Sequence, residues 1–191
     1  MIRGLIFDCD GTLVDTMPLH YMAWQSVCEK HGLVFEEERF YALGGVSSTE
    51  IFRMLLEEQG VAGDPVALSK EKEDSFLPFA PQVKAIEPVR KIVEAHRGEL
   101  PMAVATGGKR VNCTAVLKGV GMFDWFDAIV TSEDVERQKP APDIFLQAAE
   151  KIGVSPEECR AYEDTDLGMS AIRAAGMDAV DIRGLLGMIK E

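Results

Sequence analysis

The segment Ile6-Phe7-Asp8-Cys9-Asp10-Gly11-Thr12-Leu13-Val14-Asp15 decides the fold of this chain. It continues an apolar run, residues 4–7, that is typical of a buried strand. The run ends at two carboxylates, Asp8 and Asp10, which the alternation of a strand places on the same side. Two like charges are costly to bury together unless a cation binds them. The segment therefore predicts a strand that ends at a site for a hard divalent cation, such as Mg²⁺, and for a phosphate group.

Composition limits the classes of partner. The chain has 191 residues, of which 47% are hydrophobic, as in a packed globular protein. Twenty basic and 32 acidic residues give a net charge of −12. This balance argues against nucleic acid or an anionic membrane surface as the main partner. It does not argue against a phosphorylated metabolite, because a local metal ion and a lysine can outweigh the global charge.

Neither a targeting segment nor a membrane span is predicted. Arg3, Asp8 and Asp10 interrupt the N-terminal apolar run too early for a signal peptide. No stretch approaches the roughly 20 apolar residues of a membrane-spanning helix. The four cysteines are scattered without CxxC spacing, which favours reduced thiols over disulfides or a zinc site. These features predict a cytoplasmic protein.

Residues 16–81 are expected to form a purely helical block. Helical patterns cover residues 20–31, 47–59 and 64–76, and glycines at 32 and 60 fit the ends of the first two. Pro78 and Pro81 then break the pattern. The chain would enter the block near Asp15-Thr16 and leave it near residues 79–81, and these two crossings could act as a hinge.

The remainder of the chain alternates between strand and helix. Strands are expected at residues 102–105, 128–130, 160–162 and 179–182, and helices at 87–96, 111–120, 144–152 and 167–175. Such alternation predicts an α/β fold, a Rossmann-like doubly wound parallel sheet with helices on both faces. The first strand belongs to this sheet. The predicted organisation is a core formed by residues 1–15 and 82–191, with a small helical cap, residues 16–81, inserted after the first strand.

Polar residues follow four of the predicted strands, where ligands bind in open parallel sheets. These segments are Asp8-Cys9-Asp10-Gly11-Thr12, Thr106-Gly107-Gly108, Lys139-Pro140-Ala141-Pro142-Asp143 and Glu163-Asp164-Thr165-Asp166. Clustered acids need a cation, and ligands that are all oxygen favour magnesium. A hydroxyl and glycine amides at a helix start suit a phosphate, whose remaining charge a lysine would neutralise. Phosphoryl transfer through an aspartyl phosphate is the chemistry that uses all four segments.

Each group then has an expected role. Asp8 is the nucleophile, and Asp10 protonates the leaving oxygen and later activates water. Thr106 and Lys139 hold the phosphate oxygens. Asp8, Asp10 and Asp164 are the expected metal ligands, with the backbone carbonyl of Asp10 facing the ion. Whether Glu163 binds the metal directly or supports its ligands stays open.

The motifs DCDGT, ATGG, KPAPD and EDTDLG resemble those of the haloacid dehalogenase (HAD) superfamily of phosphatases and phosphomutases, in the same order. The inserted helical cap, and the ending AIRAAGMDAVDI, resemble the beta-phosphoglucomutase-like subfamily. Within it, the chain is most similar to small bacterial sugar phosphatases that favour fructose 1-phosphate. The resemblance implies Mg²⁺, a small phosphorylated sugar or polyol as substrate, a monomer or weak dimer, and a cap that opens and closes.

The resemblance also implies roles for residues of the cap. His20, in LHYMAW, matches a histidine that lies over the active site in mutase relatives. Lys72, in KEKED, matches a cap lysine that faces the substrate. The stretch Gly45-Val46-Ser47 matches the start of a loop that sets substrate specificity, and Gly107 lies beside the phosphate-binding Thr106.

Two alternatives to a phosphatase are considered. A beta-phosphoglucomutase must grip a second phosphate, and mutase relatives carry an arginine where this chain has Ser48, so the sequence favours hydrolysis. A receiver-like phospho-switch also groups aspartates, a threonine and a lysine around magnesium. A receiver domain lacks an acid at the position of Asp10 and has no helical insertion. These two differences disfavour a phospho-switch for this chain.

Overall fold

A five-stranded sheet forms the centre of the protein in the computed structural model, which describes residues 1–188. The strand order is β5-β4-β1-β6-β7, and every neighbouring pair is parallel. The bounds of these strands are β1 (Gly4–Phe7), β4 (Met102–Ala105), β5 (Ala128–Val130), β6 (Cys159–Glu163) and β7 (Asp178–Asp181). The first strand is therefore central, which explains why it is apolar throughout.

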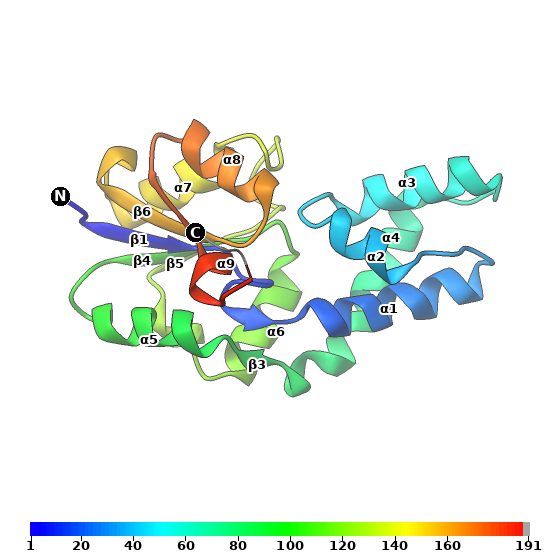
Figure 1. The fold of residues 1–191 in the computed structure, drawn as a ribbon, viewed down its shortest axis with the longest axis horizontal. Helices are drawn as coiled ribbons and strands as arrows, with labels where there is room; N and C mark the ends of the chain where they lie inside the picture. Colours follow the sequence, from blue (N-terminus) through cyan, green and yellow to red (C-terminus); the bar gives the residue numbers. More distant parts are fainter. Residues whose placement is uncertain (189–191) are drawn as a thin grey trace.

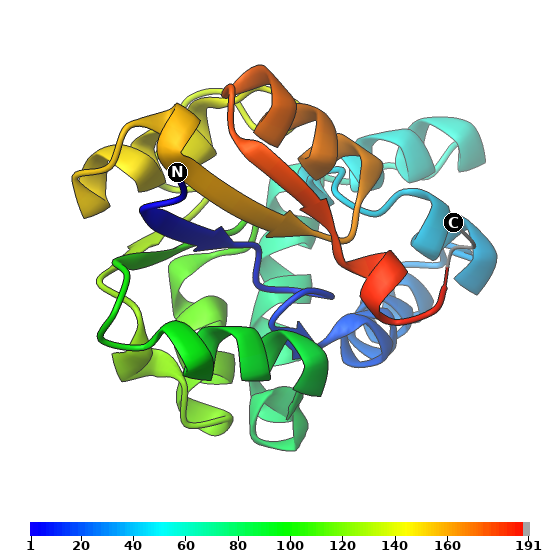
Figure 2. The ribbon, with the colours of Figure 1, turned by 60° about the vertical axis from the view of Figure 1, so that its left-hand side comes forward.

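Helices cover both faces of the sheet, as Figures 1 and 2 show. Their bounds are α5 (Glu87–His96), α6 (Arg110–Gly119), α7 (Asp143–Ile152), α8 (Asp166–Ala174) and the short α9 (Ile182–Leu185). Leu5 and Phe7 point to the face covered by α5 and α6, whereas Ile6 points to the face covered by α7 and α8. Alternation along β1 thus supplies apolar side chains to both layers. The doubly wound α/β fold expected from the sequence is confirmed.

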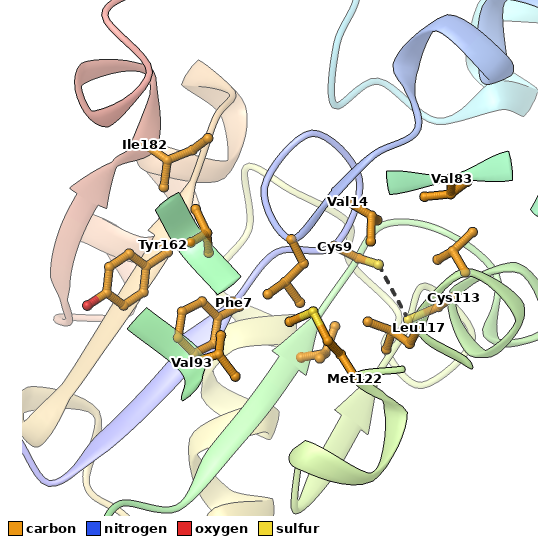
Figure 3. Close-up of a cluster of buried hydrophobic side chains, with 14 of the residues drawn as sticks. Phe7, Cys9, Val14, Val83, Val93, Cys113, Leu117, Met122, Tyr162 and Ile182 are labelled. Carbon is orange, nitrogen blue, oxygen red and sulfur yellow. Dashed lines mark hydrogen bonds between the residues drawn. The ribbon is translucent and has the colours of Figure 1, made fainter. Parts of the chain in front are cut away.

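Aliphatic, aromatic and sulfur-containing side chains together fill the layer beneath α5 and α6 (Figure 3). Phe7 of β1 stacks on Tyr162, its register partner in β6, with ring centroids 4.7 Å apart. Cys9, directly after Asp8, lies completely buried with its Sγ 3.8 Å from that of Cys113 in α6. The loop that carries the acids is therefore anchored from below by apolar packing.

The inserted block is helical and lies beyond the carboxyl ends of the strands (Figure 1). Its elements are α1 (Met17–Lys30), α2 (Glu37–Ala42), α3 (Ser48–Gln59), α4 (Pro65–Phe76) and a 3₁₀ segment (Leu77–Gln82). Ser47 caps α3 by accepting a hydrogen bond from the Glu50 amide, and Gly60 ends this helix with φ of 64°. Trp24, Phe52 and other apolar side chains form a separate core inside the block.

Some short elements were not expected from the sequence. The helix α2 has six residues, too few to show a helical period clearly. The strands β2 (Val14–Asp15) and β3 (Lys84–Ala85) pair antiparallel and join the two chain crossings. Two-residue strands leave no periodic signal, and their pairing brings together segments 69 or more residues apart in the chain.

The domain boundaries, 1–15 with 82–191 and 16–81, stay a prediction. Residues 189–191 of the expected core lie outside the described residues. Phe76 and Ala80 belong to the same apolar cluster as Phe7 of the sheet, so the base of the helical block packs onto the core. Across residues 1–188, every helix falls short of the length or the apolar character that a membrane crossing needs.

Replacing Phe52 by alanine tests the core of the helical block. The Phe52 side chain is fully buried and lies 4.3 Å, centroid to centroid, from the ring of Trp24. We expect Phe52→Ala to lower the free energy of unfolding by about 3–5 kcal/mol, because the cavity would lack apolar contacts. Urea denaturation followed by circular dichroism measures the change. Met22→Ala, at an exposed position of α1, should stay within about 0.5 kcal/mol. Equal losses for both variants would contradict a packed core in the block.

Candidate active site

One pocket lies between the carboxyl ends of the strands and the helical block. Five of the site residues expected at the strand ends line this pocket: Asp8, Asp10, Thr106, Gly107 and Lys139. The site residues expected in the helical block line the pocket as well: His20, Gly45, Val46, Ser47 and Lys72. The structure therefore brings together residues of the sheet domain and of the helical block. Within the sheet domain alone, Asp8 and Lys139 are 131 positions apart in the sequence.

A buried lysine links Asp8, after the first strand, to Glu163 at the end of β6. The Lys139 ammonium donates to Asp8 Oδ1 at 2.6 Å and to Glu163 Oε2 at 2.7 Å. All three side chains are at most 7% exposed. Burial by itself disfavours the charged lysine, but the two carboxylates outweigh it and hold the Lys139 pKa above its ordinary value. Lys139 is therefore a permanent positive charge beside Asp8.

Three carboxylates meet where a cation would bind. Asp8, Glu163 and Asp164 each offer an oxygen within 4.8 Å of the others. Burial, followed by the charge of Glu163, raises the pKa of both Asp8 and Asp164. This donor set contains only oxygen, as Mg²⁺ prefers. The arrangement fits a divalent cation, which would favour the ionised form of each acid.

The hydrogen bonds of Glu163 bear on whether it binds the metal directly or supports the metal ligands. Oε1 accepts from the amides of Asp164 and Thr165 at 3.1 and 3.0 Å and from the Thr165 hydroxyl at 2.9 Å. Oε2 accepts from Lys139. Both oxygens are thus engaged by the protein, whereas Asp164 uses one oxygen to accept from Thr12 at 2.7 Å. These contacts favour Glu163 as the residue that orients Lys139 and the β6–α8 turn.

The Asp10 carboxylate is not one of the three that meet at the expected cation site and has other partners. Its Oδ1 accepts from the Thr16 hydroxyl at 2.7 Å and lies 3.3 Å from Nε2 of His20. Burial alone would raise its pKa, but these two partners and the charge of Lys72 lower the Asp10 pKa to about 2. The three grouped carboxylates do not include that of Asp10. A metal contact through the Asp10 backbone carbonyl stays a prediction.

His20 connects Asp10 to the helical block. Its Nδ1 lies 3.0 Å from the Lys72 ammonium, and its ring stacks on Phe76 with centroids 3.9 Å apart. A lysine ammonium only donates, so Nδ1 accepts and Nε2 carries the proton toward Asp10. Burial, followed by the charge of Lys72, lowers the His20 pKa, which agrees with a neutral ring.

Backbone geometry explains two of the expected pocket residues. Thr106 is buried, and its Oγ1 accepts from the Gly108 amide at 3.0 Å, so its O–H proton remains to donate to a ligand. Gly45 has φ of 87°, and a Cβ there would lie 3.3 Å from both Leu167 and Thr165 of the sheet domain. Glycine therefore allows the loop of the helical block to approach the start of α8.

Several pocket residues were missed by the sequence analysis. Trp24, Glu73 and Asn112 line the pocket, and Thr12 and Thr16 hold the two aspartates Asp164 and Asp10. Thr12 lies inside the first motif, so its position was a usable signal. Glu73 and Asn112 gave none, because a charged residue in a charged run and a polar residue on a helix resemble surface positions.

A parallel sheet that gathers acids, a hydroxyl and a lysine at its strand ends beneath an inserted helical block is the architecture of a capped α/β enzyme that binds an anionic group. Comparison with known proteins identifies the family. The chain belongs to the haloacid dehalogenase-like hydrolases, whose family model matches residues 5–182. The family and the hydrolase class expected from the four motifs are confirmed, and the match gives no support to a receiver-like switch.

Sugar phosphatases and mutases are among the relatives. The chain is 40% identical over 180 residues to the Escherichia coli fructose-1-phosphate phosphatase YqaB, covering 94% of this chain and 96% of that protein. It is 28% identical to the Bacillus subtilis beta-phosphoglucomutase, covering 95% of this chain and 83% of that one. The crystal structure of a beta-phosphoglucomutase from Clostridium difficile superposes with a TM-score of 0.85 at 27% identity, covering 95% of this chain and 84% of that one.

Gly168 provides a test of how Glu163 is held. A Cβ at Gly168 would overlap the Glu163 carboxylate, which lies fully buried against α8. Gly168→Ala should therefore displace Glu163 and cost about 1–3 kcal/mol of stability, although alanine usually stabilises a helix. Gly184→Ala, at a helical glycine with open space around it, is the matched control and should not destabilise. Thermal melting compares them; a Gly168→Ala protein as stable as the control would contradict the packing.

Proposed function

We propose that this hydrolase is a magnesium-dependent phosphatase that releases inorganic phosphate from a small sugar phosphate through an aspartyl phosphate. One observation carries the proposal: two aspartates, two residues apart, have different surroundings. Asp8 lies beside Lys139 and two further carboxylates, and Asp10 is held by Thr16 and His20. Two such carboxylates suit two different tasks in one reaction.

Asp8 is the proposed nucleophile. Its carboxylate oxygen attacks phosphorus, and the bond between phosphorus and the sugar oxygen breaks. Lys139, the Thr106 hydroxyl and the nearby glycine amides neutralise the phosphate oxygens. Mg²⁺, held by Asp8, Asp164 and the Asp10 carbonyl, would supply positive charge for the phosphate and for the attacking carboxylate.

Asp10 is the proposed acid and base. In the first step its proton goes to the sugar oxygen as that oxygen leaves. In the second step Asp10 takes a proton from water, whose oxygen attacks phosphorus and frees both phosphate and Asp8. At a pKa of about 2 the Asp10 carboxyl is ionised at neutral pH, as acceptance of a proton in this second step requires. For the first step, the negative charge of a bound phosphate raises the pKa of the neighbouring carboxylate and favours its protonation.

Fructose 1-phosphate is the proposed model substrate. The support is the similarity to the Escherichia coli fructose-1-phosphate phosphatase over nearly the whole chain. A beta-phosphoglucomutase is the second candidate, because of the structural match to a mutase. Ser48 favours hydrolysis, because its hydroxyl donates to Glu73 at 3.0 Å, so this position supplies no cation for a second phosphate.

The cap and the cellular location are also proposals. We infer that residues 16–81 close over the substrate as a cap, with the β2–β3 pair at the crossings as the hinge. The four cysteines are free and buried, which suits a reducing compartment such as the cytoplasm. A monomer or weak dimer follows from the resemblance of the sequence alone.

Phosphate release from a panel of sugar monophosphates, with Mg²⁺ and with EDTA, tests the proposal. We expect release that depends on Mg²⁺ and is at least about 1000-fold slower in Asp8→Asn, because the amide cannot form the phosphoenzyme. Circular dichroism of the variant serves as the control for folding. Isomerisation of beta-glucose 1-phosphate, primed by the bisphosphate and without phosphate release, would instead identify a mutase. Appreciable residual hydrolysis by Asp8→Asn would refute the nucleophile assignment.

Lys72→Ala tests recognition of the sugar by the helical block. Lys72 lies between His20 and Glu73, with its side chain 5% exposed, and contacts both. We expect the KM for the preferred sugar phosphate to rise about tenfold or more, corresponding to about 1.4 kcal/mol of binding. The KM for p-nitrophenyl phosphate, which has no sugar hydroxyls, should change less. An equal rise for both compounds would argue against sugar recognition. Lys70→Ala, an exposed neighbour on the same helix, is the matched control.

A further inference from the structure

A carboxylate from the helical block, that of Glu73, lines the pocket, and the side of the pocket that it forms is called its remote end. Glu73, from α4, lines the pocket with its side chain 15% exposed. Its Oε1 accepts from the Ser48 hydroxyl at 3.0 Å and from the Lys72 ammonium at 3.1 Å. Its Oε2 accepts from Nδ2 of Asn112, which belongs to α6 of the sheet domain. Glu73 thus joins the helical block to the sheet domain across the pocket.

Asn112 leaves a hydrogen-bond acceptor unused. A carboxylate only accepts hydrogen bonds, so the amide nitrogen of Asn112 must face Glu73 and its Oδ1 faces elsewhere. Asn112 is 5% exposed, and within residues 1–188 its Oδ1 is buried without a hydrogen-bond partner. A buried acceptor in a pocket wall is costly unless a ligand donates to it.

The cations of the pocket are already engaged. Among the described residues that line it, the lysines are Lys72 and Lys139, and there is no arginine. Lys139 is bound by Asp8 and Glu163, and Lys72 is bound by Glu73 and by Nδ1 of His20. The remote end therefore holds an ion-paired carboxylate and a buried, unused acceptor, without a free cation. It suits hydroxyl donors, and it offers no free positive charge to a second phosphate or a carboxylate of a ligand.

We propose that Glu73 and Asn112 are specificity-determining residues that select substrates whose remote end is uncharged and hydroxylated. Sugar or polyol monophosphates would thus be preferred over the corresponding bisphosphates and over phosphorylated acids. A hydroxyl at this end donates to Asn112 Oδ1 or to Glu73, whereas a phosphate there leaves Asn112 Oδ1 unsatisfied and lies beside the Glu73 carboxylate without a free cation. This inference rests on the proposed phosphatase function and specifies its substrate class.

Two matched pairs of ligands isolate the effect of the second phosphate. Fructose 1-phosphate is compared with fructose 1,6-bisphosphate, and glucose 1-phosphate with glucose 1,6-bisphosphate, by initial rates of phosphate release. Dissociation constants of the same four ligands for the Asp8→Asn protein measure binding without turnover. Either orientation of a bisphosphate leaves one phosphate at the remote end. We expect kcat/KM to be at least tenfold higher for the monophosphate than for the bisphosphate in at least one pair. The Asp8→Asn protein should likewise bind that monophosphate more tightly than the bisphosphate.

Glu73→Gln removes the charge and keeps the shape of the side chain. We expect it to reduce the preference for the monophosphate about tenfold, mainly by lowering the KM of the bisphosphate. Asp74→Asn is the matched control. Asp74 is the next residue of α4, its carboxylate is 61% exposed, and it pairs with Lys70, so the same charge is lost without change in the pocket. Its preference should equal that of the unmodified protein. If Glu73→Gln melts at a lower temperature than the unmodified protein, Glu73→Ala serves as the second variant.

Four outcomes would overturn the inference. The first is equal use of mono- and bisphosphates by the unmodified protein while hydrolysis depends on Asp8, which leaves the proposed function intact. The second is an equal loss of kcat/KM for the monophosphate and the bisphosphate of a pair in Glu73→Gln, which would make Glu73 a structural residue only. The third is a shift of the preference in Asp74→Asn as large as that in Glu73→Gln. The fourth is binding of no sugar phosphate at all.

Hydrolysis of p-nitrophenyl phosphate separates this last failure from a failure of the proposed function. If that compound is hydrolysed and no sugar phosphate binds, the phosphatase chemistry stands and the substrate class is wrong. If neither is hydrolysed, the proposed phosphatase function fails together with the inference.

Discussion

The buried ion pairs of Lys139 with Asp8 and Glu163 are the constraint on which the site depends. Three charged side chains, each at most 7% exposed, come from the ends of β1 and β6 and from the segment after β5. None of them could be buried alone, because the cost of desolvating an unpaired charge is large. The parallel order of the strands meets this need, since it places their carboxyl ends at one edge. Stability of the sheet and placement of Asp8, the proposed nucleophile, are therefore coupled.

The helical block extends this charge network to the second aspartate. His20 and Lys72 connect Asp10 to α1 and α4, and Glu73 connects α4 to Asn112 of the sheet domain. Opening of the block would break these contacts and would also change the surroundings that set the Asp10 pKa. Cap position and acid–base chemistry would therefore be linked in the proposed reaction, because the same hydrogen bonds serve both.

The sequence predicted the strand-end groups well for a simple reason. Apolar strands, their alternation and the rule for parallel sheets are local or topological, so Asp8, Thr106 and Lys139 could be placed at one edge. Family resemblance then added His20 and Lys72, which line the pocket. The β2–β3 pair was not predicted, because two-residue strands carry no period and their pairing is long-range. Nor could the sequence assign Glu163, whose role follows from four hydrogen bonds that it accepts from Lys139, Asp164 and Thr165.

The sequence by itself determined the fold class, the hydrolase family and the groups at the ends of the strands. These follow from periodicity and from motifs whose residues lie close together in the chain. Only the tertiary structure decided that Asp10 turns toward His20, that Glu163 orients Lys139, and that Glu73 meets Asn112, 39 positions away. The physical reason is that a hydrogen bond depends on distances of about 3 Å and on direction. Such geometry arises when helices pack, and no local pattern of residues specifies it.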